Sequence, residues 1–249
     1  MKLKHTASRL IKRALRHSAP QMPRKPASPF TVALRIAGSY PPLAEYYMVG
    51  PAENYFIHSG YKPRLENAFF DDTDFEGEWQ DEVYQFANEI AGREQLASVC
   101  DVGCGSAFKL MKYFPEIQTI GLDLEPTVRK LRNKYPNRRW LVCDFSIPPP
   151  FSPDLVICSD VIEHLADPNQ LLEFVGNLRP RYIIFSTPDR NLFRIGSHNG
   201  PPRNPAHVRE WSMPQFRAYI ETRFEVLDHF ISNASQCTQC LLARPIVSG

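Results

Sequence analysis

Ser98-Val-Cys-Asp-Val-Gly-Cys-Gly105 is the stretch that decides the fold of this 249-residue chain. An apolar run reaches Asp101 and then gives way to two glycines, Gly103 and Gly105, which predicts a strand followed by a tight turn. A second apolar run, Thr119-Ile-Gly-Leu-Asp123, ends in an acid 20 positions after Gly103, about the length that one helix and one strand require. The two strand ends together predict a nucleoside site, with the ligand close to the glycine backbone and Asp123 on a ribose.

Apolar runs and amphipathic stretches alternate along the rest of the chain. Strands are expected near 97–102, 118–123, 139–143, 154–158 and 181–186, and helices near 78–94, 106–113, 126–134 and 168–178. Ser212-Met-Pro-Gln215 predicts a capping box at the start of a further helix over 213–222. Two last strands, over 224–231 and 240–246, are close enough to pair as a hairpin. This order predicts an α/β fold with a doubly wound, mostly parallel sheet.

Composition divides the chain into three parts. Residues 1–43 combine a basic amphipathic segment with a proline-rich linker, residues 44–78 are rich in aromatic side chains, and residues 79–249 carry the alternating pattern. The basic start, over 1–17, predicts a peripheral membrane contact, a contact with a partner protein, a mitochondrial transit segment or a solvated tail. The aromatic part predicts an N-terminal helical and irregular cap that selects the substrate.

Charge and cysteine content narrow the class of protein. The chain has a net charge of +2, but nine of its 29 bases lie in residues 1–35, which leaves 20 bases against 27 acids in the remainder. This acidic body makes a nucleic-acid partner unexpected. Six cysteines without a secretory signal predict reduced thiols and a cytoplasmic protein. The protein would be peripheral to a membrane if its N-terminus binds one, and it would lie in the mitochondrial matrix if it is eukaryotic. No apolar run approaches the roughly 18 residues of a spanning helix.

The glycine turn distinguishes between two kinds of nucleoside cofactor. A dinucleotide site requires Gly-x-Gly-x-x-Gly, and the third position here is the bulky Phe108, which disfavours hydride transfer. Asp101-Val-Gly103-Cys-Gly105-Ser-Ala107 instead resembles the Asp-x-Gly-x-Gly-x-Gly loop of class I S-adenosylmethionine-dependent methyltransferases. Ala107 replaces the last glycine of that pattern. The resemblance extends over about residues 80–245.

The resemblance implies a Rossmann-like, seven-stranded sheet of order 3-2-1-4-5-7-6, with the last strand antiparallel. It also implies S-adenosylmethionine as cofactor, with Asp123 on both ribose hydroxyls, Leu124 on the adenine and Asp144 accepting from the adenine amino group. The full set that the resemblance assigns to the cofactor is Asp101, Gly103, Cys104, Gly105, Asp123, Leu124, Asp144, Phe145 and Ser159. The alternative for any single strand-end Asp is a cap on the next helix.

Ser159-Asp-Val-Ile-Glu-His164 follows the fourth expected strand. It differs from the Asn/Asp-Pro-Pro-Tyr/Phe sequence of enzymes that methylate nucleobase amino groups. It resembles the corresponding segment of ubiquinone-biosynthesis O-methyltransferases. It also resembles small-RNA 2′-O-methyltransferases, in which Glu-x-x-Glu-His and a later His bind a divalent metal. The candidate metal ligands are Asp160, Glu163 and His164, which share one face if a helix begins here, and His207 as a fourth. A role without metal is favoured, because Asp160 is shorter than the usual Glu.

His207 and His164 are the candidate catalytic residues. His207 lies in a Pro/Gly-rich loop after the fifth expected strand, where an imidazole can take a proton from a hydroxyl. The alternative is a hydrogen bond from His207 that fixes Glu210, and Trp211 is expected to be a packing anchor. The predicted function is in-line O-methylation of a sugar, glycan or other small-molecule hydroxyl. The alternatives are a metal-dependent RNA 2′-O-methyltransferase and a non-catalytic cofactor-binding scaffold.

Overall fold

The computed structural model describes residues 55–193 and 199–246. The basic segment and linker predicted over 1–43, the membrane or partner contact predicted for 1–17, and the first residues of the cap lie outside these ranges. The helices are α5 (Asp81–Arg93), α6 (Phe108–Tyr113), α7 (Glu125–Lys134), the 3₁₀ turn η2 (Ile162–His164), α8 (Asn169–Asn177), α9 (Arg190–Phe193) and α10 (Met213–Ile220). The strands are β1 (Ser98–Val102), β2 (Gln118–Asp123), β3 (Arg139–Val142), β4 (Leu155–Ser159), β5 (Tyr182–Pro188), β6 (Phe224–Asn233) and β7 (Thr238–Pro245).

The strands form one seven-stranded sheet of order β3-β2-β1-β4-β5-β7-β6. The five strands from β1 to β5 pair in parallel, and β7 is antiparallel to both β5 and β6. The predicted Rossmann-like architecture and strand order are therefore confirmed. The sheet reverses its order between β1 and β4, and ligands of such sheets bind at the carboxyl ends of the strands beside this point.

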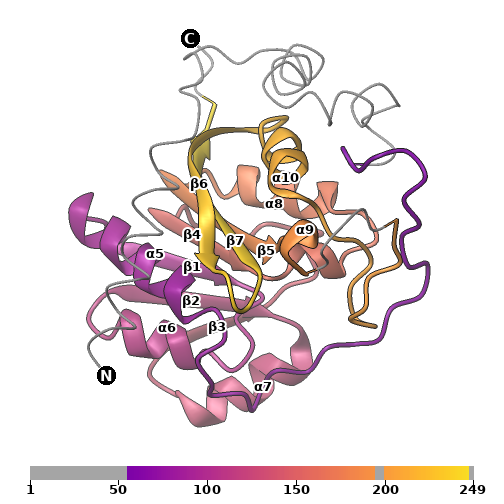
Figure 1. Ribbon diagram of the computed structural model, residues 1–249. Coiled ribbons are helices and arrows are strands. Elements are labelled where there is room, and N and C mark those ends of the chain that lie inside the picture. The colour runs from indigo at the N-terminus through magenta and orange to yellow at the C-terminus, as the bar shows by residue number, and fades with distance from the viewer. Residues whose placement is uncertain (1–54, 194–198, 247–249) are drawn as a thin grey trace, which may run out of the picture.

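Two apolar clusters, one on each face of the sheet, make up the core. Alternate residues of β1 and β4 supply the two clusters: Val99 and Ile157 belong to one, and Cys100 and Val156 to the other. Helices α5, α6 and α7 pack on the first cluster, and α8 and α10 on the second. Figure 1 shows the sheet between these two helical layers. Strands buried on both faces explain why the predicted strands are continuous apolar runs instead of alternating ones.

Residues 55–80 precede α5 and contain turns and bends but neither helix nor strand. In Figure 1 this indigo and violet segment runs from the neighbourhood of α10 past α7 to the start of α5. The predicted helical character of the cap is wrong for these residues, because their backbone pairs with another loop. The N–H groups of Lys62, Arg64 and Ala68 donate to the carbonyls of Asn199, Val208 and Pro205 at 2.7, 2.8 and 2.9 Å.

Other local predictions are confirmed or adjusted. The backbone N–H of Ser212 donates to Oε1 of Gln215 at 3.2 Å, as the capping box at the start of α10 requires. Helix α5 begins at Asp81 and not near residue 78, since Gln80 takes a left-handed φ of 64°. The six cysteines, all within the described ranges, are free thiols. Among the described residues, no helix is long and apolar enough to cross a membrane.

Trp211 anchors the start of the described chain. Its side chain is fully buried, stacks on Tyr219 with 5.7 Å between ring centroids, and donates its Nε1–H to the carbonyl of Tyr55 at 2.8 Å. The predicted packing role of Trp211 is confirmed.

We expect Trp211→Phe to lower the free energy of unfolding by about 2 kcal/mol, because it leaves a cavity and removes the donor to the partly buried Tyr55 carbonyl. Urea unfolding followed by circular dichroism measures the change. The matched control is Trp79→Phe: Trp79 is half exposed, so this change should stay within about 0.5 kcal/mol. Equal losses in the two variants would contradict the anchoring role.

Candidate active site

The turn after β1 approaches two other segments closely. Gly103 and Gly105 take φ values of 72° and 48°, which favour glycine. A Cβ on Gly103 would lie 2.5 Å from Cγ2 of Val161, so the segment after β4 packs directly on this turn. Ala107 also takes a positive φ, 55°, at the position where the family pattern has glycine. The loop keeps the glycine-type conformation at Ala107 despite the substitution.

Asp123 holds this turn from the end of β2. Its Oδ2 accepts the N–H of Gly105 at 2.8 Å and its Oδ1 accepts the N–H of Leu124 at 2.7 Å. The Thr127 side chain supplies a third hydrogen bond, which still leaves the carboxylate a lone pair for a ribose hydroxyl. Burial raises the pKa of Asp123. Leu124 is exposed beside it, available to pack on an adenine.

Asp101, in β1 just before the turn, has a buried carboxylate oxygen without a hydrogen-bond partner. It is fully buried, and its Oδ2 accepts from the Tyr84 hydroxyl at 2.9 Å, while its Oδ1 has no partner. Burial raises the pKa of Asp101 to about 7. A buried acceptor of this kind fits the ammonium group of S-adenosylmethionine, so the residues present fit the cofactor. Sequence reasoning missed Lys109, a buried cation close enough to Asp101 to affect its pKa.

Two predicted cofactor residues direct their side chains away from the turn. Cys104 is buried, with its Sγ 2.8 Å from the position of a Cβ on Gly121, so its side chain cannot contact a ligand, and its backbone N–H donates to the Leu122 carbonyl at 3.2 Å. Ser159 Oγ lies 2.9 Å from Ser186 Oγ, between β4 and β5. The side chains of both residues therefore serve packing and strand pairing.

Asp144 and Phe145 follow β3 and lie in a turn. Oδ1 of Asp144, which is exposed, accepts the Ser146 N–H at 3.0 Å and its hydroxyl at 2.5 Å. Phe145 takes a φ of 68° and packs edge-on against Phe174, 5.5 Å between centroids. Their contacts with an adenine remain a prediction.

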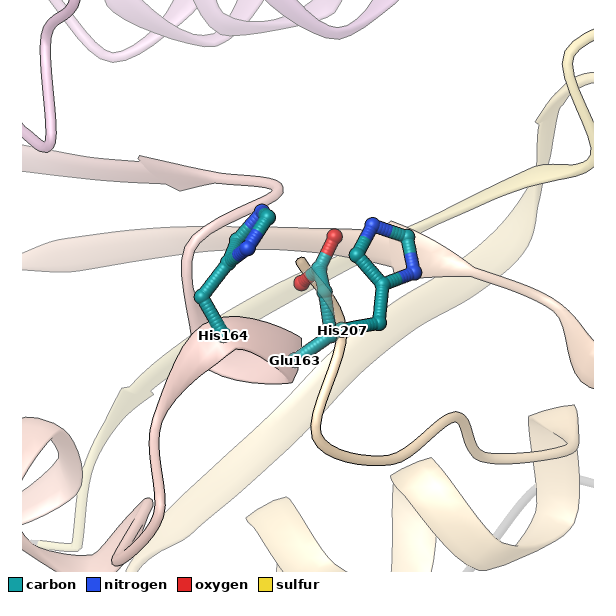
Figure 2. Close-up of side chains that lie close together, drawn as sticks. All are labelled: Glu163, His164 and His207. Atoms are coloured by element: carbon teal, nitrogen blue, oxygen red, sulfur yellow. The ribbon is translucent and has the colours of Figure 1, made fainter. Parts of the chain in front are cut away.

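Glu163, His164 and His207 converge at the carboxyl edge of the sheet. One ligand atom from each lies within 4.8 Å of the others, and the two imidazoles meet edge to face with 4.9 Å between ring centroids (Figure 2). Glu163 and His164 come from η2, and His207 from the loop between α9 and α10. Asp160, the fourth candidate ligand, is not in this cluster. It lies before η2 with a φ of 53°, and its Oδ1 accepts from the Ser186 hydroxyl at 2.7 Å, so the predicted shared helical face is wrong for Asp160.

Hydrogen bonds define which nitrogen of each imidazole can accept a proton. His164 Nδ1 lies 3.0 Å from the Ala206 carbonyl, which can only accept, so Nδ1 carries hydrogen and Nε2 has the lone pair. His207 Nδ1 donates to Oε1 of Glu210 at 3.0 Å, and its Nε2 accepts from Nδ2 of Asn204 at 2.9 Å. His164 Nε2 therefore keeps its lone pair, whereas the lone pair of His207 Nε2 is engaged by Asn204. Sequence reasoning missed Asn204.

Glu163 adds a third acceptor beside the two imidazoles. Its Oε2 accepts from the Thr187 hydroxyl at 2.9 Å, but its Oε1 is buried without a partner. Burial and the nearby Asp160 raise the pKa of Glu163 well above its usual value, and burial lowers the pKa of His164 to about 4. When Glu163 is ionised, its Oε1 and the Nε2 of His164 are acceptors without a donor. A cation or a ligand with hydroxyl groups would satisfy these acceptors.

The cap covers the cluster. Phe70, itself exposed, stacks on the His164 ring with 5.7 Å between centroids. Asn67 donates from Nδ2 to the carbonyls of His164 and Ala206 at 3.1 and 3.0 Å. Residues 67–70 therefore form a wall over His164.

Comparisons with known proteins find a matching family and a curated relative. The family model described as a methyltransferase domain matches residues 72–233. The small RNA 2′-O-methyltransferase of Mus musculus is 28% identical over 168 residues, which cover 55% of this chain and 40% of that protein. The chain thus matches less than half the length of this curated relative.

Solved structures share the fold at low sequence identity. An S-adenosylmethionine-dependent methyltransferase from Clostridium acetobutylicum ATCC 824 superposes with a TM-score of 0.53 at 15% identity, over 66% of this chain and 91% of that one. The methyltransferase domain of a bacterial protein, CtHen1-CN, gives a TM-score of 0.51 at 18% identity, over 68% and 100%. These two likenesses establish the fold alone.

Thiol reactivity tests the placement of Cys104. Five cysteines are buried and Cys237 is half-buried, and burial raises the pKa of the Cys104 thiol well above its usual value. We therefore expect one fast-reacting thiol with Ellman's reagent in the native protein, and six after unfolding. Cys237→Ser should remove the fast phase. Rapid labelling of Cys104, located by peptide mass spectrometry, would contradict its position in the core.

Proposed function

The chain belongs to the methyltransferase domain family and carries an S-adenosylmethionine-dependent methyltransferase domain, and on this premise we propose that it methylates a hydroxyl group of a sugar or glycan. One observation carries the proposal: the hydrogen-bond acceptors His164 Nε2, His207 Nε2 and Glu163 Oε1 lie close together, and of these Glu163 Oε1 is buried without a partner while His207 Nε2 accepts only from Asn204. A sugar ring presents adjacent hydroxyls, which can donate to Glu163 Oε1 and His164 Nε2 and can replace Asn204 at His207 Nε2.

The chemistry of methyl transfer favours a hydroxyl acceptor. The sulfonium carbon is attacked in line and the thioether leaves neutral, so positioning accounts for most of the acceleration. A hydroxyl is a weak nucleophile and needs a proton acceptor as the new C–O bond forms. Glu210 keeps hydrogen on Nδ1 of His207, which leaves Nε2 to take the hydroxyl proton. Without a ligand, Asn204 donates to this nitrogen. The hydroxyl of the methyl acceptor would take the place of Asn204 as donor.

His164 and Glu163 then act on the neighbouring hydroxyl of the same ring. His164 Nε2 is an acceptor with hydrogen fixed on Nδ1, and burial keeps the ring neutral at physiological pH. Phe70 lies over this ring and offers an apolar face to the sugar carbons. This assigns catalysis to His207 and acceptor binding to His164, Glu163 and the cap.

A second candidate function is methylation of the 2′-hydroxyl of an RNA end with a divalent cation. The similarity to the mouse small RNA 2′-O-methyltransferase favours it, as does the Glu163, His164 and His207 cluster. Two imidazoles and one carboxylate with an unpartnered oxygen fit a divalent cation. Such a cation would polarise the acceptor hydroxyl as a Lewis acid. The acidic balance of residues 36–249 weighs against an extended RNA surface.

The base assignment is tested with His207→Ala. We expect turnover on a sugar acceptor to fall at least about 100-fold, because the proton acceptor is lost. S-adenosylmethionine affinity, measured by calorimetry, should be unchanged. Glu210→Gln should cause a smaller loss, and Glu225→Gln, which breaks a surface ion pair with Arg244, should cause none. Turnover of His207→Ala close to that of the wild type would overturn the assignment.

Chelation separates the two candidate functions. Labelled cofactor is offered with a panel of sugars and glycans and with a short RNA bearing free 2′- and 3′-hydroxyls, before and after dialysis against EDTA. We expect methylation of a sugar acceptor that survives dialysis. Methylation of the RNA end that disappears with EDTA and returns with Mn²⁺ or Mg²⁺ would instead establish the second candidate. Cofactor binding without any methyl transfer would support a non-catalytic scaffold.

A further inference from the structure

Asp72 belongs to the cap, yet its carboxylate lies against the glycine turn. A Cβ built on Gly105 would overlap both carboxylate oxygens of Asp72. Family patterns gave no reason to select this residue, which stands in the acidic run Asp71-Asp-Thr-Asp-Phe-Glu76. Only the path of the cap brings it to the carboxyl ends of β1 and β2.

Neighbouring residues fix the cap on both sides of Asp72. Asp71 Oδ1 accepts the Thr73 N–H at 3.1 Å and its hydroxyl at 2.5 Å, and Thr73 Oγ1 lies 3.4 Å from Thr127 Oγ1 on α7. Two further contacts join the cap to α7: Lys130 to Asp74 at 3.2 Å and Lys134 to Glu76 at 2.5 Å. Asp71, Thr73, Asp74 and Glu76 therefore account for the attachment of the cap, whereas Asp72 faces the turn.

The turn carries more negative charge than its cations balance. Asp72, Asp101 and Asp123 lie close enough to affect one another, and burial with Asp123 raises the pKa of Asp72 to about 6. The cation among them is Lys109, whose Nζ lies 5.7 Å from the Phe75 ring and 5.9 Å from the Tyr84 ring. Lys109 forms no ion pair with any residue in the described ranges. Asp101 Oδ1 is buried without a donor at the same place.

We propose that Asp72 is a cofactor-binding residue supplied by the cap, and that it shares the α-ammonium group of S-adenosylmethionine with Asp101. An ammonium group has three donors, enough for the orphaned Asp101 Oδ1 and for a carboxylate oxygen of Asp72. Lys109 then faces the carboxylate of the same amino-acid end. This inference rests on the cofactor of the proposed function and not on its acceptor.

The arrangement joins the two halves of the active site through the cap. Phe70, two residues before Asp72, stacks on His164 of the acceptor site. A cofactor that holds Asp72 in place therefore also holds the wall over His164. The methionine end of the cofactor thus orders the surface on which the acceptor binds.

Calorimetric titrations of Asp72→Asn test the proposal with three ligands. S-adenosylmethionine and S-adenosylhomocysteine carry the ammonium group, and 5′-methylthioadenosine lacks the whole amino-acid end. We expect the first two affinities to fall about tenfold or more, since a charge-assisted hydrogen bond is lost. The affinity for 5′-methylthioadenosine should change less than about twofold.

Asp74→Asn is the matched control, because Asp74 lies in the same acidic run but pairs with Lys130 at the surface. It should leave all three affinities unchanged. Asp72→Ala provides a second variant with the same expected ranking, and thermal unfolding of the ligand-free proteins verifies their fold.

Three outcomes would overturn the proposal. Equal loss of all three affinities would mean that Asp72 only supports the turn, and no loss would mean that it does not contact the cofactor. A loss of affinity for S-adenosylmethionine alone would mean that Asp72 contacts the sulfonium group and not the ammonium group. No acceptor is present in these titrations, so failure to find O-methylation would leave their result intact.

Discussion

The hydrogen bond from the Gly105 N–H to the Asp123 carboxylate, 2.8 Å long, is the interaction on which the site depends. It ties the turn after β1 to the end of β2, beside the point between β1 and β4 where the order of the parallel sheet reverses. The positive φ values of Gly103 and Gly105 allow the backbone to turn sharply enough to make it. Val161 packs on this turn, which positions η2 and hence Glu163 and His164. One strand-end geometry thus sets the places of both the cofactor and the acceptor.

Unpartnered acceptors mark both halves of the active site. Asp101 Oδ1 in the cofactor half and Glu163 Oε1 in the acceptor half are buried carboxylate oxygens without donors, and burial raises the pKa of both groups. Burying such atoms costs stability in the ligand-free protein, and a ligand with the matching donors recovers it. An ammonium group fits the first half. Adjacent hydroxyls or a divalent cation fit the second.

The cap connects these halves because its backbone is irregular. Its N–H groups pair with the loop that carries His207, and its acidic side chains pair with Lys130 and Lys134 on α7. A regular helix would have used those N–H groups for its own hydrogen bonds and could not have reached both the loop that carries His207 and helix α7. Irregular backbone allows Phe70 to reach His164 while Asp72 reaches Gly105, two residues further along the chain.

The sequence by itself determined the strands of the sheet and the residues of the glycine turn. The order of the strands came from the family resemblance. Buried parallel strands are short apolar runs and their turns require glycine, so Ser98–Gly105 and Asp123 are readable from local pattern alone. The sequence also predicted that Glu163, His164 and His207 lie together. It wrongly placed Asp160 with them: the φ of 53° at Asp160 takes its side chain off the expected helical face, and this side chain accepts from Ser186 instead. Only the tertiary structure decided which nitrogen of each histidine accepts, that Cys104 points into the core, and that Asp72 meets Gly105. Those features depend on contacts between segments far apart in the chain, and no local periodicity encodes where an irregular cap crosses the edge of a sheet.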